Sequence, residues 1–292
     1  MNLDLALLLK RANLLYDAVL QPGDDIAAAA ALFDRLFLTP GDYGAQGAIN
    51  LVNPGACIHA LPGTVNWSYE TASGQAVWMK DAIQELVGVD ILVEVAADVL
   101  RMESDAAMID RVSLTATDGG RALVSDVDDT TVGGVLVRDS YFQANDNNAI
   151  ELQANSGGDG FNDWTFKGVT AKALKTSGTY AALRLLGDDT CPVGCFVRIR
   201  IEGGYYFSYA ASAIYADNPA GTVEIIRQLY IGGGVWLGSN VASGNVPGYN
   251  IADAQYCLLG DRMIDRKTGT GAEGTIAGTG NVASAAVTDR VS

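Results

Sequence analysis

A repeat of about 30 residues restricts the possible folds of this 292-residue chain more than any other feature of its sequence. An alanine followed by alternating apolar residues begins at Ala122, Ala149, Ala182 and Ala213, at intervals of 27 to 33 residues. A unit of this length cannot bury an apolar face alone, so successive units are expected to stack on one another.

A second landmark keeps the same period. Short alternating runs such as VLVRDSYF and WTFKGVTA are broken by a turn residue, and these turn residues are Asp139, Gly168, Gly203 and Gly233. Glycine and aspartate tolerate the positive φ angle that a tight corner requires. The two landmarks together predict a strand, a corner and a second strand in each repeat.

Each strand is predicted to pair in parallel with its counterpart one repeat away, because a full turn of a coil supplies the long connection that parallel strands need. No Asn-Gly type hairpin dipeptide separates the runs, although an antiparallel sandwich remains the main alternative. Alternation predicts inward side chains at Val135, Val137, Ile150 and Leu152, and outward side chains at Leu136, Glu151 and Gln153.

The segment GVLVRDSYFQANDNNAIELQA resembles the repeats of right-handed parallel β-helix proteins of the pectate-lyase-like class. The resemblance covers residues 112–240 and implies a mainly β chain built as a right-handed parallel β-helix solenoid. The last stretch, GTGAEGTIAGTGNVASAAVTDRVS, is similar in texture to the terminal segments of bacteriophage tail-spike and virion-fibre proteins, where small residues let the chains of a trimer wrap closely.

Residues 1–41 are predicted to form two helices that precede the solenoid. The first places Leu5, Leu8, Leu9, Ala12 and Leu15 on one face, and the second runs from Ile26 to Phe37 before Pro40 and Gly41 stop it. Leu7 and Leu14 lie beyond this face and need a second partner. Together with their neighbours Leu8 and Leu15 they are the predicted attachment surface. A cap over the open end of the solenoid is the alternative role.

The remaining ranges complete the expected organisation. Residues 42–111 are interpreted as a mixed junction with a helix-like segment near 77–86, residues 112–240 as the β-helix, and residues 241–292 as a β segment rich in Gly, Ala and Thr.

Charge and hydropathy exclude two classes of partner. The net charge of −15 and the absence of a Lys/Arg cluster argue against nucleic acid, which requires gathered basic side chains. The longest helical apolar run, Ile26 to Phe33, is far shorter than the roughly 20 residues that span a bilayer.

The four cysteines are too scattered for a disulfide scaffold, although Cys191 and Cys195 could close a small loop.

No motif points to a cofactor or a metal. The pattern Gly269-Thr-Gly271-Ala-Glu-Gly274 lacks the preceding strand and following helix of a dinucleotide site. The single histidine, His59, is expected in a loop and in a structural role, which leaves no Ser/His/Asp centre and no zinc site.

Two groups of surface residues remain as candidates. Paired carboxylates of a polysaccharide-cleaving β-helix could be drawn from inter-strand loops, where aspartate is also common as a turn former. The candidates are Asp126, Asp128, Asp129, Asp159 and Asp163. The adjacent Tyr205 and Tyr206 belong to an aromatic-rich stretch that suits subunit packing better than sugar binding.

The sequence therefore predicts a non-enzymatic structural component of a bacteriophage virion, as a tail spike, tail fibre or head decoration protein. It is expected to form a homotrimer, to contact other virion proteins through its N-terminal helices, and to need no cofactor. A polysaccharide-cleaving or glycan-binding β-helix protein that uses the loop carboxylates is the alternative, with a host surface glycan as its partner.

Overall fold

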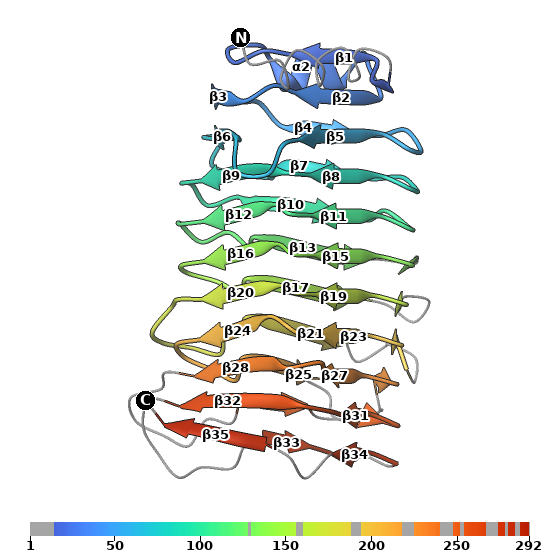
Figure 1. Cartoon of the computed structure of the whole chain (residues 1–292), viewed down its shortest axis with the longest axis vertical. Coiled ribbons are helices and arrows are strands. Elements are labelled where there is room, and N and C mark those ends of the chain that lie inside the picture. The colour runs from blue at the N-terminus through green and yellow to red at the C-terminus, as the bar shows by residue number, and fades with distance from the viewer. Residues whose placement is uncertain are drawn as a thin grey trace.

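The chain forms a parallel β-helix in which each turn of the coil contributes one strand to each of three or four sheets (Figure 1). The computed structural model describes residues 15–127, 130–155, 160–187, 194–217, 225–239, 248–251, 254–266, 274–277, 280–283 and 287–291. Every strand pair recorded within these residues joins strands from successive coils, and all of these pairs are parallel. The predicted parallel solenoid is therefore confirmed, and the antiparallel sandwich is excluded.

Four sheets, named A to D, run along the coil stack, and the described strands are as follows. Sheet A contains β1 (Ala18–Leu20), β2 (Arg35–Leu38), β5 (Cys57–Ala60), β8 (Glu85–Val87), β11 (Met108–Asp110), β15 (Leu136–Arg138), β19 (Thr165–Lys167), β23 (Arg200–Glu202), β27 (Tyr230–Gly232), β31 (Leu258–Leu259) and β34 (Val282–Ala283). Sheet B contains β3 (Gly41–Ala45), β6 (Val65–Tyr69), β9 (Val89–Val93), β12 (Ser113–Ala116), β16 (Tyr141–Ala144), β20 (Thr170–Ala173), β24 (Tyr205–Ser208), β28 (Val235–Ser239), β32 (Arg262–Arg266) and β35 (Val287–Val291).

The other two sheets complete the coil. Sheet C contains β4 (Ile49–Leu51), β7 (Gln75–Met79), β10 (Asp98–Met102), β13 (Leu123–Val127), β17 (Ile150–Ala154), β21 (Leu183–Gly187), β25 (Ile214–Asp217), β29 (Tyr249–Ile251) and β33 (Gly274–Ile276). Sheet D contains β14 (Thr131–Gly133), β18 (Gly160–Asn162), β22 (Phe196–Val197), β26 (Ile226–Arg227) and β30 (Ala254–Gln255).

The corners between sheets A and B occupy the predicted positions. Asp139, Gly168, Gly203 and Gly233 all have positive φ angles, between 46° and 69°. The backbone N–H of each of the first three donates to a carbonyl of the next coil, which continues the ladder of the sheets around the corner. A glycine next to these corners also permits close packing, because a Cβ on Gly204 would lie 2.1 Å from the Val169 carbonyl oxygen.

A second set of corners, before sheet A, carries positive φ angles on residues that are not glycine. Asp163, Arg198, Gln228 and Tyr256 have φ angles of 54° to 62°, and the first three donate their N–H groups to the next coil at 3.0 Å. Bulky residues in this conformation give no sequence signal, so the second corner could not be recognised from composition.

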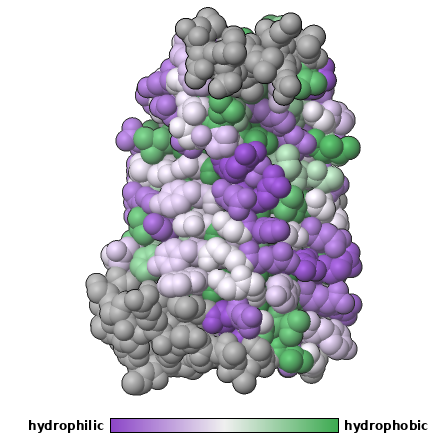
Figure 2. All heavy atoms as spheres, viewed as in Figure 1, coloured by the Kyte–Doolittle hydropathy of each residue, from purple (hydrophilic) through white to green (hydrophobic). Residues whose placement is uncertain are grey.

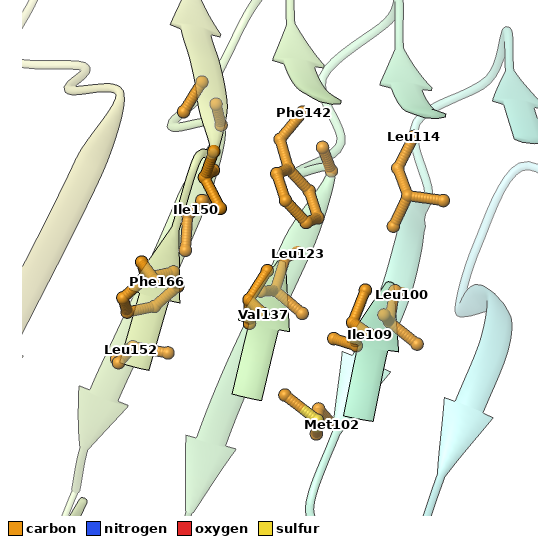
Figure 3. Close-up of a cluster of buried hydrophobic side chains, with 14 of the residues drawn as sticks. Leu100, Met102, Ile109, Leu114, Leu123, Val137, Phe142, Ile150, Leu152 and Phe166 are labelled. Carbon is orange, nitrogen blue, oxygen red and sulfur yellow. The ribbon is translucent and has the colours of Figure 1, made fainter. Parts of the chain in front are cut away.

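The interior of the coil is filled by apolar side chains stacked in rows. The four predicted inward residues Val135, Val137, Ile150 and Leu152 are 0 to 1% exposed. Figure 3 shows Val137 beside Ile109 and Ile150 beside Leu123, which are their partners on the preceding coil. Phe161 and Phe196 stack with ring centroids 5.2 Å apart in the interior of sheet D. This contact between successive coils fixes their register as well as burying apolar area.

The second predicted N-terminal helix is confirmed at its start, and its extension to Phe37 is wrong. The second helix is limited to α2 (Ile26–Ala30), capped by the Asp25 side chain, and the chain then enters strand β2 (Arg35–Leu38). Leu36 and Leu38 are fully buried because the strand pairs with β1 and β5 and completes the first coil. Tertiary pairing thus overrides the helical spacing of the apolar residues. The first predicted helix, which the sequence allows to continue as far as Pro22, lies outside the described residues up to position 14, and its last part is wrong because Ala18–Leu20 form strand β1.

The α2 helix closes the N-terminal end of the stack (Figure 1), with Ile26 and Ala29 buried in the core. This contact favours the alternative role of a cap for residues 26–30. The described residues contain no helix that is long and apolar enough to cross a membrane.

The predicted helix near residues 77–86 is also wrong. The range contains strands β7 and β8, in which Val77, Met79 and Leu86 point into the core. Strands β3 to β11 of residues 42–111 and strands β29 to β35 near the C-terminus join the same sheets as the central repeats. In the view of Figure 2, apolar side chains form separate patches among polar ones on the outer surface.

Two of the sequence motifs lie mostly beyond the described residues. Cys191, one end of the possible small loop, lies outside them, whereas Cys195 is buried with its sulfur 3.6 Å from the Ile225 carbonyl oxygen. Gly269 and Gly271 of the glycine pattern also lie outside them, and Gly274 begins strand β33.

Candidate functional site

A groove of about 420 Å³ lies on the outer face of sheet B in the N-terminal coils. The cross-coil register places Asp42, Asn66, Asp90 and Ser113 in one outward column, at one residue per coil. A parallel column contains Ser68, Leu92 and Thr115, and Glu94 follows strand β9 at the edge of the groove. The lining side chains are therefore carboxylates, hydroxyls and an amide, beside the apolar Leu92.

The carboxylates of the groove differ in their surroundings. Burial raises the pKa of Asp90 above its usual value, and no neighbouring cation offsets this effect. Asp42 is exposed and accepts a hydrogen bond of 2.8 Å from the backbone N–H of Gly44. The two aspartates thus combine a carboxyl that gains a proton more easily with one that stays solvated, as a general acid and a base require.

The two aspartates are separated by two coils. Neighbouring strands lie about 4.8 Å apart, which places the backbones of Asp42 and Asp90 about 9 to 10 Å apart. Carboxyl groups of inverting glycosidases are roughly 6.5 to 9.5 Å apart, which leaves room for a water molecule. The backbone separation of Asp42 and Asp90 is thus close to the upper limit of this range, and the groove presents carboxylates, hydroxyls and an amide as hydrogen-bonding groups.

The sequence reasoning missed this groove. Asp42, Asn66 and Asp90 follow one another at 24-residue intervals, which is close to the repeat period. Extending the repeat backwards into residues 42–111 would have placed them in one column.

The predicted loop carboxylates are not brought together where the structure describes them. Asp126 lies in strand β13 of sheet C, beside Gln153 of the next coil, and accepts a hydrogen bond from Asn155 Nδ2. Asp163 lies at the corner before sheet A and forms a bidentate ion pair with Arg198, which lowers its pKa. Asp128, Asp129 and Asp159 lie outside the described residues.

The candidate interface residues divide in a similar way. Tyr206 is fully buried in the core, so its predicted place at an interface is wrong. Its side chain points inward, in one row with Ala171 and Leu237 of the neighbouring coils. Tyr205 points outward, stacks on Phe207 at 6.0 Å, and neighbours Trp236 on the next coil. Leu15 is 62% exposed, whereas Leu7, Leu8 and Leu14 lie outside the described residues.

The single histidine lies in strand β5, and the predicted loop is wrong at this position. His59 Nδ1 is 2.6 Å from the Tyr16 hydroxyl, and Nε2 is 2.8 Å from Glu85 Oε2. These contacts tie the segment before β1 to strands β5 and β8, which is a structural role. Among the described residues, no group of three or more His, Cys, Asp or Glu side chains is placed to hold a metal ion.

Together, the coiled sheets define a parallel β-helix protein with a carboxylate-lined groove. The chain is similar to three solved structures: Dettilon tailspike protein (gp208), at 12% identity and a TM-score of 0.47 over 92% of this chain and 66% of that one; YbhC of Escherichia coli, at 11% and 0.47 over 83% and 75%; and the A-module of the Azotobacter vinelandii mannuronan C-5 epimerase AlgE6, at 10% and 0.33 over 91% and 93%. No protein-family model matches the sequence, and no curated protein matches it significantly.

Replacing Asp90 by asparagine is expected to make the protein more stable near neutral pH. Because the pKa of Asp90 is raised in the folded state, its contribution to stability is complete below its ordinary pKa of 3.8 and is lost as the pH rises through the raised value. An asparagine keeps the shape of the side chain without this ionisation. Melting temperatures between pH 3 and pH 8 should therefore separate the two proteins only at the higher pH values. An equal difference at every pH would contradict the burial of this carboxyl.

Proposed function

We propose that this protein is a non-enzymatic structural component of a bacteriophage virion, in which the β-helix is a rigid body attached through its N-terminal end. The supporting observation is a group of exposed apolar side chains at that end, where Leu15, Leu32 and Phe33 are 62%, 77% and 40% exposed. Exposed apolar groups beside a capped coil suit a docking contact. The chain also carries a continuous ladder of cross-coil hydrogen bonds, which gives the stiffness that a projecting part needs.

The location is tested on purified particles. Gold-labelled antibodies raised against the purified chain are expected to decorate one part of the virion, and light scattering of the purified protein is expected to give the mass of a trimer. Absence of the chain from purified particles would contradict the virion role, and a monomer mass would contradict the trimer.

The attachment surface is tested by the double substitution Leu32→Ser and Phe33→Ser. It removes exposed apolar groups and leaves the buried Ile26 and Leu36 in place, so the protein should fold and fail to join particles. Leu61→Ser, at a position 37% exposed between sheets A and B, is the matched control and should join normally. Normal incorporation of the double variant would place the attachment surface elsewhere.

The raised pKa of Asp90 favours a second candidate function, the cleavage of a polysaccharide in the sheet B groove. In this function Asp90 donates a proton to the leaving oxygen and Asp42 activates water. Purified protein incubated with host polysaccharide would then release soluble fragments, and Asp90→Asn would abolish the release. Binding without fragments would leave a glycan-binding role, and the absence of both would leave the structural proposal alone.

A further inference from the structure

Two adjoining hollows on the C-terminal coils gather arginines on a strongly acidic chain. One has a volume of about 570 Å³ and the other about 460 Å³, and they share Arg198, Gln228 and Tyr256. The first also includes Arg200 and the second Arg227. Three of the 19 Lys and Arg residues of a chain with net charge −15 therefore line one surface, with Asp163 as the single carboxylate among the lining residues.

The fold positions these side chains by stacking them on successive coils. Arg198, Gln228 and Tyr256 are consecutive members of the corner before sheet A, and Arg200, Tyr230 and Leu258 are consecutive members of the adjacent column of sheet A. Strands β23, β27 and β31 of this column lie one below another in Figure 1. Regular coil positions therefore supply these lining residues of the two hollows, and no long loop is needed to place them.

The three arginines keep donors available for a ligand. Arg198 uses two donors on Asp163, at 2.5 and 2.7 Å, and Arg200 uses two on Glu202, at 2.9 and 2.7 Å. A guanidinium carries five N–H donors, so three remain on each. Arg227 is exposed and forms no ion pair with any described residue.

Two tyrosines give the surface an aromatic component. The guanidinium carbon of Arg200 lies 5.6 Å from the Tyr230 ring centroid, and Tyr256 is 64% exposed. Each ring lies against a glycine. A Cβ on Gly232 would meet the Tyr230 hydroxyl at 2.5 Å, and one on Gly280 would meet Tyr256 Cδ1 at 2.7 Å. The rings can therefore approach the backbone closely and still present apolar surface to a ligand.

We propose that this surface, formed by Arg198, Arg200, Arg227, Gln228, Tyr230 and Tyr256, binds a saccharide that carries a carboxylate, such as a uronic acid unit. The planar guanidinium matches a carboxylate in a bidentate contact. The tyrosine rings suit the apolar face of a sugar ring, and the amides of Gln228 and Gln255 suit its hydroxyls. A free oxyanion would use the arginines and leave the rings and amides without a role. The site is independent of the virion proposal and of the groove on sheet B.

Calorimetric titration of the full chain with tetragalacturonate tests the proposal. The wild type is expected to bind it, and Arg200→Gln and Arg227→Gln are each expected to weaken binding about tenfold, the loss of one charge-assisted contact. Maltotetraose, a neutral sugar of the same length, is expected not to bind. Tyr256→Ala changes an exposed side chain and should weaken binding without affecting the melting temperature.

Arg111→Gln is the matched control, because Arg111 is also an exposed arginine with a positive φ angle at a coil corner but lies on the β11 coil. It should bind tetragalacturonate within about twofold of the wild type, because it lies outside the proposed surface. The proposal is overturned if the wild type does not bind, if maltotetraose binds equally well, or if Arg111→Gln weakens binding as much as Arg227→Gln. It is also overturned if inorganic phosphate binds as tightly as the saccharide, since the site would then recognise an oxyanion alone.

Discussion

Ile150→Asp is expected to prevent folding. Ile150 is fully buried between Leu123 and Leu183 of the neighbouring coils, and the strand leaves no route to water for a carboxylate. Burying an unpaired carboxylate is so costly that the group takes up a proton instead, and the combined cost of this protonation, of the buried polar group and of the lost packing is comparable with the roughly 5 to 15 kcal/mol by which a domain is stable. The variant should be insoluble on expression, or should lack the β-sheet circular dichroism signal and a cooperative melting transition.

Thr165→Asp is the matched control for this substitution. Thr165 is a partly exposed, outward residue of strand β19, and its partner on the next coil is Arg200. The new carboxylate stays in water, so the melting temperature should change by only a few degrees. A folded Ile150→Asp protein, or equal damage from both substitutions, would contradict the assigned inward and outward faces.

Glu151→Lys is expected to destabilise the protein by about 3 kcal/mol or more, the typical effect of removing one partner from a buried ion pair. Although Glu151 points outward from its strand, it is only 5% exposed. Its carboxylate accepts from Arg121 at 2.5 Å and from Asn148 at 2.6 Å, and lies 3.6 Å from Arg184. A lysine would remove these contacts and place a third cation between two arginines.

Glu70→Lys makes the same change of charge at an exposed site, after the end of strand β6, and should shift stability by less than about 0.5 kcal/mol. Chemical denaturation of both variants measures the difference. If Glu151→Lys were as stable as Glu70→Lys, the network around Glu151 would not contribute to the folded state. The alternation of the strand alone predicts a silent Glu151→Lys substitution, whereas the buried contacts of Glu151 predict a large loss of stability.

The sequence alone determined the solenoid and its inner rows. The corners at Asp139 and Gly168 and the inward positions of Val137 and Leu152 are properties of single repeats, and the period follows from the spacing of such repeats along the chain. Alternation within a strand and the φ angle of a corner depend on nearby residues, so a local pattern carries them. The same reasoning failed for Phe37, whose helical spacing is genuine, because pairing of β2 with β5 decides its conformation.

Only the tertiary structure decided which outward side chains are buried, paired or gathered into sites. Arg121 and Glu151 are 30 residues apart in sequence, yet their ion pair buries a carboxylate that alternation assigns to solvent. The cross-coil register likewise places Asp42 and Asp90 on one surface, two coils apart. It makes Arg200 and Tyr230 direct neighbours. The physical reason is that a coil brings together residues 18 to 35 positions apart, and the length of each intervening loop sets that register.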